Sequence, residues 1–185
     1  MLKTTRNTLL GLCFVLFQSS ITAQVTKASA NNNDYISKDG AIESIEAAKE
    51  GFFEEINNHF GSILVYFLEP FVESPKSGLK KLEEDKDYAF MEIAQHPKYL
   101  AISKSLQDFK NYADSAVADI KKKNQGLSNA EIRFIMNQLE ARYKLIKTKL
   151  SEFQAILNNK NFQQSFRESV ENAKSSSNVK GAKKP

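Results

Sequence analysis

Cysteine is nearly absent from this sequence, which has a single one, Cys13, among 185 residues. Cys13 lies in an N-terminal segment that we expect to be removed, so the mature chain should contain no thiol. Such a chain cannot form one of the disulfide-stapled domains that are common among small secreted proteins. The roughly 160 residues that remain are enough to bury a sizeable hydrophobic core. We therefore expect one domain that is held together by packing alone.

Apolar runs long enough to cross a membrane are missing as well. The N-terminal run covers residues 9–17, whereas a transmembrane helix needs ~20 apolar residues. Lys3 and Arg6 precede this run, and small or polar residues up to Ala23 follow it, which is typical of a cleavable signal peptide. We predict cleavage after Ala23 and export to the periplasm, the cell surface or the exterior of a bacterium. An uncleaved anchor helix and lipid attachment at Cys13 are the less favoured interpretations.

Seven glycines and two histidines leave little room for the common catalytic motifs. No glycine-rich pattern of the kind that cradles phosphate occurs, and no serine lies in the Gly-x-Ser-x-Gly pattern of hydrolases. A mature chain without cysteine has no thiol nucleophile, and without Cys-x-x-Cys-His it has no covalent haem. We therefore expect a protein that is not an enzyme and that carries no cofactor.

An excess of charge of one sign is also missing from the body of the chain. Of the 26 basic residues, two lie in the predicted signal peptide and three follow Lys174, so the rest nearly balance the 22 acidic ones. No aromatic residues are interleaved with the basic ones, so we expect no nucleic-acid partner. Lys121, Lys122 and Lys123 form a candidate anion-binding cluster. Lysines at a helix end also complement the helix dipole, and this second interpretation is preferred.

Apolar residues at helical spacing, in contrast, are abundant. The first stripe predicts a long amphipathic helix that begins near Ile42. Its members are Ile45, Phe52, Ile56, Phe60, Ile63, Phe67 and Phe71. Pro70 should end or kink this helix, because proline donates no amide hydrogen. Residues 24–39 precede the helix as a flexible leader, and residues 74–78 follow it as a turn.

Two further long helices and a shorter one are predicted downstream. Pro97 suits the first turn of a helix whose apolar stripe ends at Ile120. Ser128 and Glu131 match a capping box, which marks the start of a third long helix that reaches Leu157. The shorter helix is predicted from the stripe Phe162, Phe166, Val170 and Ala173.

These elements predict an all-α fold, an antiparallel helical bundle of three long helices and one or two short ones. We expect the bundle domain to span residues 40–174 and to be followed by a disordered basic tail over residues 175–185. Residues 80–87 are too polar for more than a short, exposed helix or loop. Their carboxylates, including Asp85, should lie on a solvated face.

The densest apolar stretch runs from Ile63 to Phe71, with three phenylalanines upstream. Burial in the core is the preferred interpretation of such aromatic density. The alternative is a face that binds a partner or enters a membrane interface, formed by Phe60, Ile63, Tyr66, Phe67 and Phe71.

Each of the two histidines follows a glutamate by four residues: Glu55 precedes His59, and Glu92 precedes His96. This spacing puts both side chains of a pair on one helix face. Di-iron sites in helical bundles, however, use the shorter Glu-x-x-His spacing. A surface or helix-capping role is therefore preferred for both histidines, which remain weak candidates for metal binding, and no metal is predicted.

The leading hypothesis is an exported helical-bundle interaction protein, an accessory, adaptor or chaperone-like factor of the bacterial envelope without catalytic activity. Its partner would be another envelope or extracellular protein. The alternative is a membrane-active secreted protein or effector, with a membrane surface as its partner, that uses the run from Ile63 to Phe71. A third hypothesis is a helical carrier of a metal or small ligand. The sequence does not fix the oligomeric state.

Overall fold

The protein is almost entirely helical in a computed structural model that describes residues 35–72 and 79–180. The helices of this part are α2 (Lys38–Val72), α3 (Leu79–Ala94), α4 (Pro97–Lys122), α5 (Asn129–Leu157) and α6 (Lys160–Lys180). The strands β1 (Tyr35–Ile36) and β2 (Leu127–Ser128) pair antiparallel. The predicted signal peptide, most of the predicted leader and the turn at residues 74–78 lie outside the described residues. The prediction of an all-α helical bundle is confirmed.

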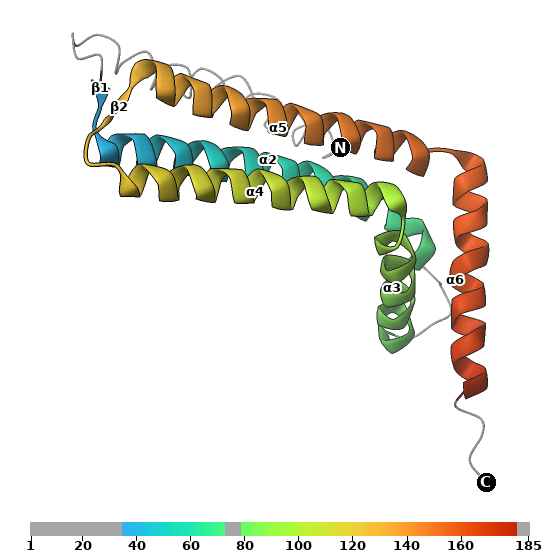
Figure 1. The fold of residues 1–185 in the computed structure, drawn as a ribbon. Helices are drawn as coiled ribbons and strands as arrows, with labels where there is room; N and C mark the ends of the chain where they lie inside the picture. Colours follow the sequence, from blue (N-terminus) through green and yellow to red (C-terminus); the bar gives the residue numbers. More distant parts are fainter. Residues whose placement is uncertain (1–34, 73–78, 181–185) are drawn as a thin grey trace, which may run out of the picture.

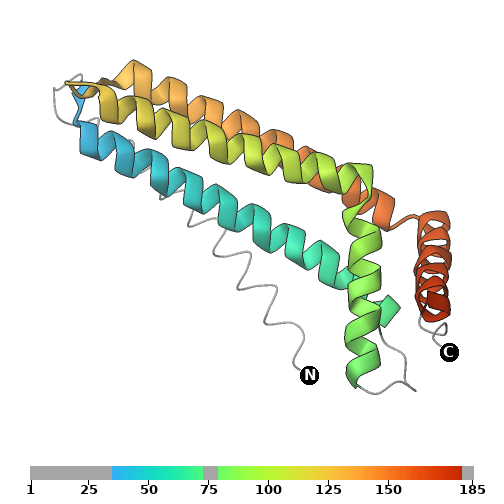
Figure 2. The same cartoon turned by 60° about the horizontal axis from the view of Figure 1, so that its bottom comes forward.

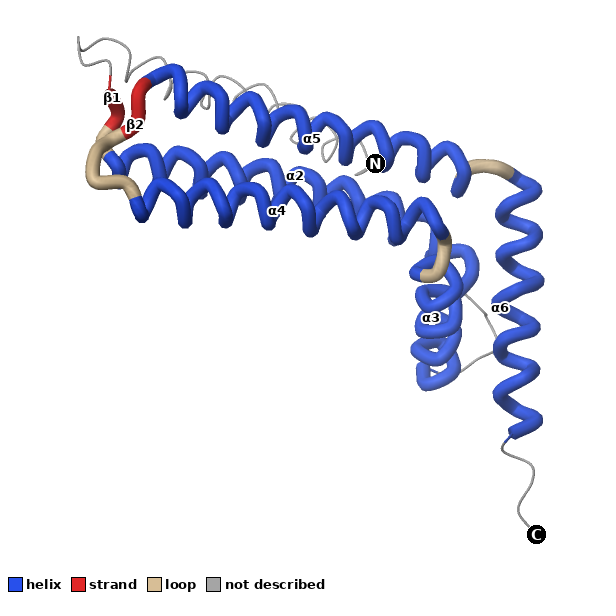
Figure 3. Tube along the Cα trace, viewed as in Figure 1, coloured by secondary structure: helices blue, strands red, loops and turns tan. Residues whose placement is uncertain are grey.

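Three long helices form the body of the molecule. α2, α4 and α5 pack against one another along their lengths, and α4 runs antiparallel to the other two (Figure 1). α3 and α6 leave one end of this bundle at a steep angle and lie next to each other (Figures 1 and 2). We call this end, residues 60–71, 88–99 and 153–170, the elbow. The opposite end, residues 35–38 and 121–131, carries the strand pair and is called the tip (Figure 3).

The predicted apolar stripes face the interior of the bundle. Among the fully buried side chains are Phe109 and Phe153, and the largest others are isoleucines and leucines of the same stripes. Phe52 lies between helices, stacked on Tyr143 with ring centroids 4.4 Å apart and edge-on to Phe109 at 6.3 Å. Such aromatic pairs add stability beyond the area that they bury. One continuous core therefore joins α2, α4 and α5.

The prediction of a short, exposed helix or loop at residues 80–87 is right in part: the segment is helical, and Glu84 and Asp87 are exposed, but the helix is longer than expected and Asp85 is buried. α3 is a single helix of 16 residues that continues through this segment. Among the side chains of α3 whose burial is described, those of residues 84–94, the buried ones are Asp85, Ala89 and Ile93, one on each successive turn. Asp85 interrupts the apolar pattern of the helix. Because it is a carboxylate, its burial is not apparent from the sequence.

The helix ends also differ from those expected. α2 begins at Lys38 and includes Pro70, which is exposed two residues before the helix ends. The leader therefore ends earlier than residue 39, because β1 pairs with β2 and α2 follows directly. α6 continues to Lys180 rather than stopping at Lys174, so the first part of the predicted disordered tail is helical.

Candidate functional site

The elbow is built around a continuous cluster of nine rings. Neighbouring ring centroids lie 4.9 to 6.3 Å apart. The cluster takes side chains from each of the five helices and from the turn before α4. Its members are Phe60, Phe67, Phe71, Phe90, His96, Tyr99, Phe153, Phe162 and Phe166. The aromatic density of α2 thus serves mainly to join α3 and α6 to the bundle, and we call these two helices the arm.

The residues predicted as a partner or membrane face do not form one exposed surface. Ile63 and Phe67 are buried, and Phe60 and Phe71 are half-buried against the core. Tyr66 alone of the five projects into solvent, with 75% of its surface exposed, next to Val65 with 68%. The core interpretation therefore holds for most of the run, and only its outer edge is free to meet a partner.

A shallow groove of about 200 Å³ lies between α2 and α5 next to Tyr66. Its base is formed by the buried side chains of Ile63, Phe67 and Leu157, and exposed polar and aromatic residues surround them. These rim residues are His59, Ser62, Tyr66, Gln154 and Asn158. An apolar base with a polar rim is the general form of a protein-binding surface. We call this site the α2–α5 groove.

The rim of the α2–α5 groove does not resemble a catalytic arrangement. The Ser62 hydroxyl donates a hydrogen bond to the Asn58 carbonyl of its own helix at 2.7 Å, rather than to His59. A serine nucleophile needs its base within hydrogen-bond distance. The groove therefore offers contact area and polar partners, but no activated nucleophile.

His96 caps α4 and contributes to the ring cluster. Its Nδ1 accepts a hydrogen bond from the Lys98 amide at 3.2 Å, which satisfies one free N–H of the first helical turn. Its ring packs against Phe153 and Phe162. Burial, reinforced by the charge of Lys98, lowers the pKa of His96 below its usual value. The capping role expected for this histidine is confirmed.

The two histidines are not brought into a metal site. His59 lies on the exposed rim of the α2–α5 groove, whereas His96 caps α4. Glu55 is engaged by the Lys147 ammonium at 3.1 Å and by the Tyr143 hydroxyl. Within residues 35–72 and 79–180, no three His, Cys, Asp or Glu side chains form a group that could hold a metal ion.

A buried ion pair fastens α6 to α3 within the arm. The Lys174 ammonium lies 3.1 Å from a carboxylate oxygen of Asp85, whose side chain is only 7% exposed. Burial lowers the pKa of Lys174, but its hydrogen bonds with Asp85 and Glu171 outweigh this effect, so the net change is upward. The expectation that Asp85 lies on a solvated face is wrong, because α6 covers it.

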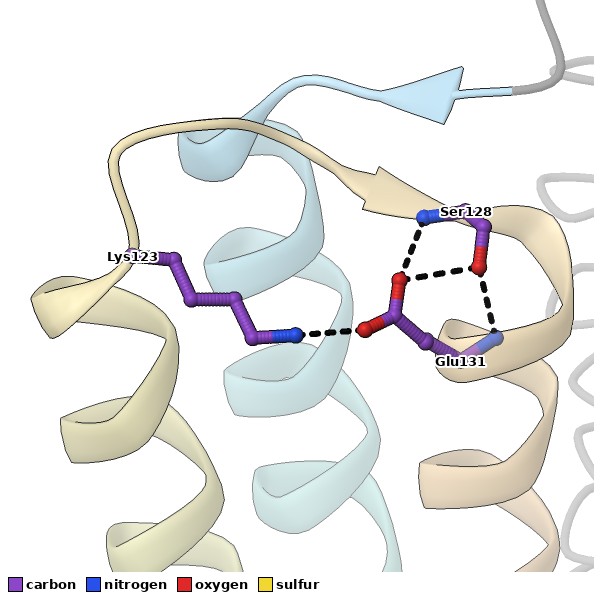
Figure 4. A network of polar contacts seen from close by, with 3 residues as sticks. All are labelled: Lys123, Ser128 and Glu131. Carbon is purple, nitrogen blue, oxygen red and sulfur yellow. Dashed lines mark hydrogen bonds and ion pairs between the residues drawn. The ribbon is translucent and has the colours of Figure 1, made fainter.

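The tip contains a polar network that fixes the start of α5 (Figure 4). The Glu131 carboxylate accepts hydrogen bonds from the Ser128 amide at 2.9 Å and the Ser128 hydroxyl at 2.8 Å, and the Ser128 hydroxyl accepts one from the Glu131 amide. Lys123 adds an ion pair at 2.5 Å. The ion pair and these hydrogen bonds lower the pKa of Glu131 to about 2. The predicted capping box is confirmed.

The lysine cluster at the end of α4 is partly neutralised by this arrangement. Lys123 pairs with Glu131 and Lys122 with Asp119, while the Lys38 ammonium donates to the backbone carbonyl of Lys121. Two of the three ammonium groups thus have carboxylate partners, which fits a helix-end role better than an anion site.

No helix of the described part is long and apolar enough to cross a membrane. Comparison with protein-family models, with curated proteins and with solved structures finds no match. Function must therefore be inferred from the residues of this chain.

The sequence did not indicate which apolar side chains remain outside. Besides Val65 and Tyr66, the large exposed apolar residues near the elbow are Phe90, Met91 and Leu100. Phe90 and Met91 lie in a mostly apolar stretch, residues 88–94, in which periodicity alone does not separate them from buried Ala89 and Ile93. Phe90 and Met91 are exposed because α3 packs mainly against α2 and α6 through its opposite face.

Proposed function

We propose that the protein is an exported helical-bundle interaction protein, an accessory, adaptor or chaperone-like factor of the bacterial envelope, without catalytic activity of its own. Its partner is another envelope or extracellular protein. The observation that supports this proposal is the exposure of Val65 and Tyr66 beside the α2–α5 groove.

Tyr66 has the properties of an interface anchor. Tyrosine is enriched where proteins meet, because its ring buries a large apolar area and its hydroxyl finds a polar partner. It stands beside the apolar base of the groove, and Gln154 and Asn158 of α5 supply hydrogen-bonding groups at the rim. A partner side chain that entered the groove would cover Tyr66 while keeping polar contacts at the edge.

The test is cross-linking in the native cell, followed by affinity purification through a C-terminal tag and mass spectrometry. Wild-type protein should retain one dominant protein partner, and Tyr66→Asp should lose it. Phe134→Asp is the matched control, because Phe134 is a similarly exposed ring on the bundle, with 63% of its surface exposed. This control should retain the partner. Retention by Tyr66→Asp, catalytic turnover or a tightly bound cofactor would contradict the proposal.

A second candidate function, membrane activity, is supported by the same pair of exposed side chains. Tyrosine beside an apolar residue suits the interface of a bilayer. Purified mature protein would then bind or leak liposomes, and Tyr66→Asp would reduce the effect. Phe67→Asp is unsuitable for this test, because Phe67 is buried and its replacement would disturb the fold. Liposomes of neutral and anionic composition that neither leak nor bind the protein would exclude this candidate.

A further inference from the structure

The outward face of α3 forms a second hollow, separate from the α2–α5 groove. It has a volume of about 400 Å³ and is lined by Glu84, Asp87, Tyr88, Phe90 and Met91. We call it the α3 hollow. Four of these residues share one helix face by their spacing of three or four, while the opposite face of α3 is buried.

The apolar side of the α3 hollow is held in place but left uncovered. Phe90 is 44% exposed and Met91 51% exposed. The Phe90 ring meets Tyr99 of α4 edge-on, at 6.3 Å between centroids, so its orientation is fixed by the helix next to it. Tyr88 is half-buried and packs against the core. A ligand would therefore meet preorganised rings and a flexible thioether.

The charged side of the α3 hollow is acidic. Glu84 and Asp87 are exposed one turn apart, and in the described part of the chain neither carboxylate has an ion-pair partner. Asp85 between them differs, because it points inward to Lys174. The body of the protein is nearly neutral overall. Attraction of a cation to this face would therefore be local and would not follow from net charge.

We infer that the α3 hollow binds a cationic amphipathic segment of a protein partner, with a lysine or arginine between Glu84 and Asp87 and an apolar side chain against Phe90 and Met91. Carboxylates complement the cation, and aromatic faces attract it as well. The apolar walls would bury the neighbouring side chain of the same segment. This inference rests on the proposed role as an interaction protein, but it concerns a different surface and specifies the chemistry of the partner.

The chain contains no tryptophan, which provides a clean binding assay. The probe is a synthetic amphipathic peptide of leucine and lysine with one tryptophan, whose fluorescence can be excited without a tryptophan signal from the protein. A peptide with glutamate in place of lysine is the charge control. We expect the lysine peptide to bind and the glutamate peptide not to bind.

The decisive variant is E84Q/D87N, which removes both charges of the hollow and keeps its shape. We expect this double variant to bind the lysine peptide about tenfold or more weakly than the wild type, because two charge-assisted contacts are lost. The matched control is E43Q/D108N, which removes one glutamate and one aspartate charge from exposed positions of α2 and α4. This control should bind the peptide as the wild type does.

Several outcomes would overturn the inference. Equal weakening by the two double variants would show general attraction without a site, and tight binding of the glutamate peptide would exclude cation recognition. Self-association in sedimentation that E84Q/D87N abolishes would assign the hollow to a second copy instead. In native-cell cross-linking, a partner that is retained by E84Q/D87N but lost with Tyr66→Asp would overturn the inference and leave the proposed function standing.

Discussion

The two ends of the bundle are stabilised by different kinds of interaction. The tip relies on polar contacts: the network of Lys123, Ser128 and Glu131, whose members are at most eight residues apart, and the pairing of β1 with β2. The elbow relies on rings that are distant in sequence, and beyond it the buried pair of Asp85 and Lys174 joins α3 to α6. Contacts between neighbours in sequence therefore determine where α5 starts, whereas the packing of α3 and α6 at the elbow depends on contacts between distant segments.

The largest effect is expected at the centre of the ring cluster. Phe67 is 5% exposed and contacts Phe71, Phe162 and Phe166. Phe67→Ala should lower the free energy of unfolding by about 3 to 5 kcal/mol, because it leaves a cavity. Val65→Ala, on the exposed side of the same helix, should change it by less than about 0.5 kcal/mol. Denaturant unfolding of both variants measures the difference, and equal effects would contradict the assignment of a core role to Phe67.

A slightly smaller loss is expected from breaking the buried ion pair of the arm. Asp85→Asn leaves the Lys174 ammonium poorly compensated and should cost about 2 to 4 kcal/mol, since Glu171 remains nearby. Asp119→Asn, which breaks the exposed pair with Lys122, should cost less than about 1 kcal/mol. Hydrogen exchange should show the loss first in α3 and α6. Unchanged protection of both helices would mean that the pair does not fasten the arm.

The tip should be sensitive at one glycine. A Cβ atom at Gly126 would lie 2.2 Å from the Ile36 carbonyl oxygen, where β1 meets β2, so the backbone must shift to admit it. Gly126→Ala should destabilise by about 1 to 3 kcal/mol. Gly61→Ala is the matched control, because nothing lies within 4 Å of its added Cβ. Because Gly61 lies in the middle of α2, Gly61→Ala should raise the free energy of unfolding by about 0.5 to 1 kcal/mol. Thermal unfolding that moves in the same direction for both variants would contradict this account.

The two ends should also respond differently to acid. The folded-state pKa of His96 at the elbow is lowered, so the folded chain binds this proton less readily than the unfolded chain. Its contribution to stability is complete above about pH 6.5 and decreases as the pH falls through the lowered pKa. His96→Asn keeps a capping acceptor but does not titrate. The difference in free energy of unfolding between wild type and variant, measured as a function of pH, should therefore change below pH 6.5. A constant difference would argue against a neutral imidazole cap.

The smallest effect is expected at the tip and in a more acidic range. Glu131 has its pKa lowered from 4.5 to about 2, so its contribution is present above pH 4.5 and is lost as the pH falls towards 2. Unfolding midpoints of wild type and Glu131→Gln should differ above pH 4.5 and converge towards pH 2. A difference that persists unchanged at pH 2 would show that the carboxylate charge is not what the network stabilises.

Much of the fold could be predicted because helices leave a periodic trace in sequence. The stripes of α4 and α5, the cap at Ser128 and the proline at the start of α4 were each readable within a few residues. The structure of α3 and its contact with α6 were harder to predict. The stripe of α3 is broken by Asp85, and nothing near it in sequence reveals that Lys174 lies across from it.

The candidate sites show the same division. The sequence indicated that the run around Phe67 was important and that it could be either core or interface. Only packing separated its members, since Phe67 faces α6 while Tyr66, one residue away, projects outward. The α3 hollow was not predicted, because its carboxylates were expected to be ordinary surface charges and the sequence pattern does not show that they share a surface with Phe90 and Met91.

Local sequence patterns are enough to predict the helical class, the cap at Ser128, the helix start at Pro97 and the stripes that form the core, because capping and periodicity depend on neighbours along the chain. The burial of Asp85, the contact of Gly126 with β1 and the exposure of Tyr66 and Phe90 arise from packing between distant segments. Those outcomes depend on which surfaces the elbow and the tip bring together. The solvent exposure of a residue depends on the whole fold, and short-range sequence patterns do not determine it.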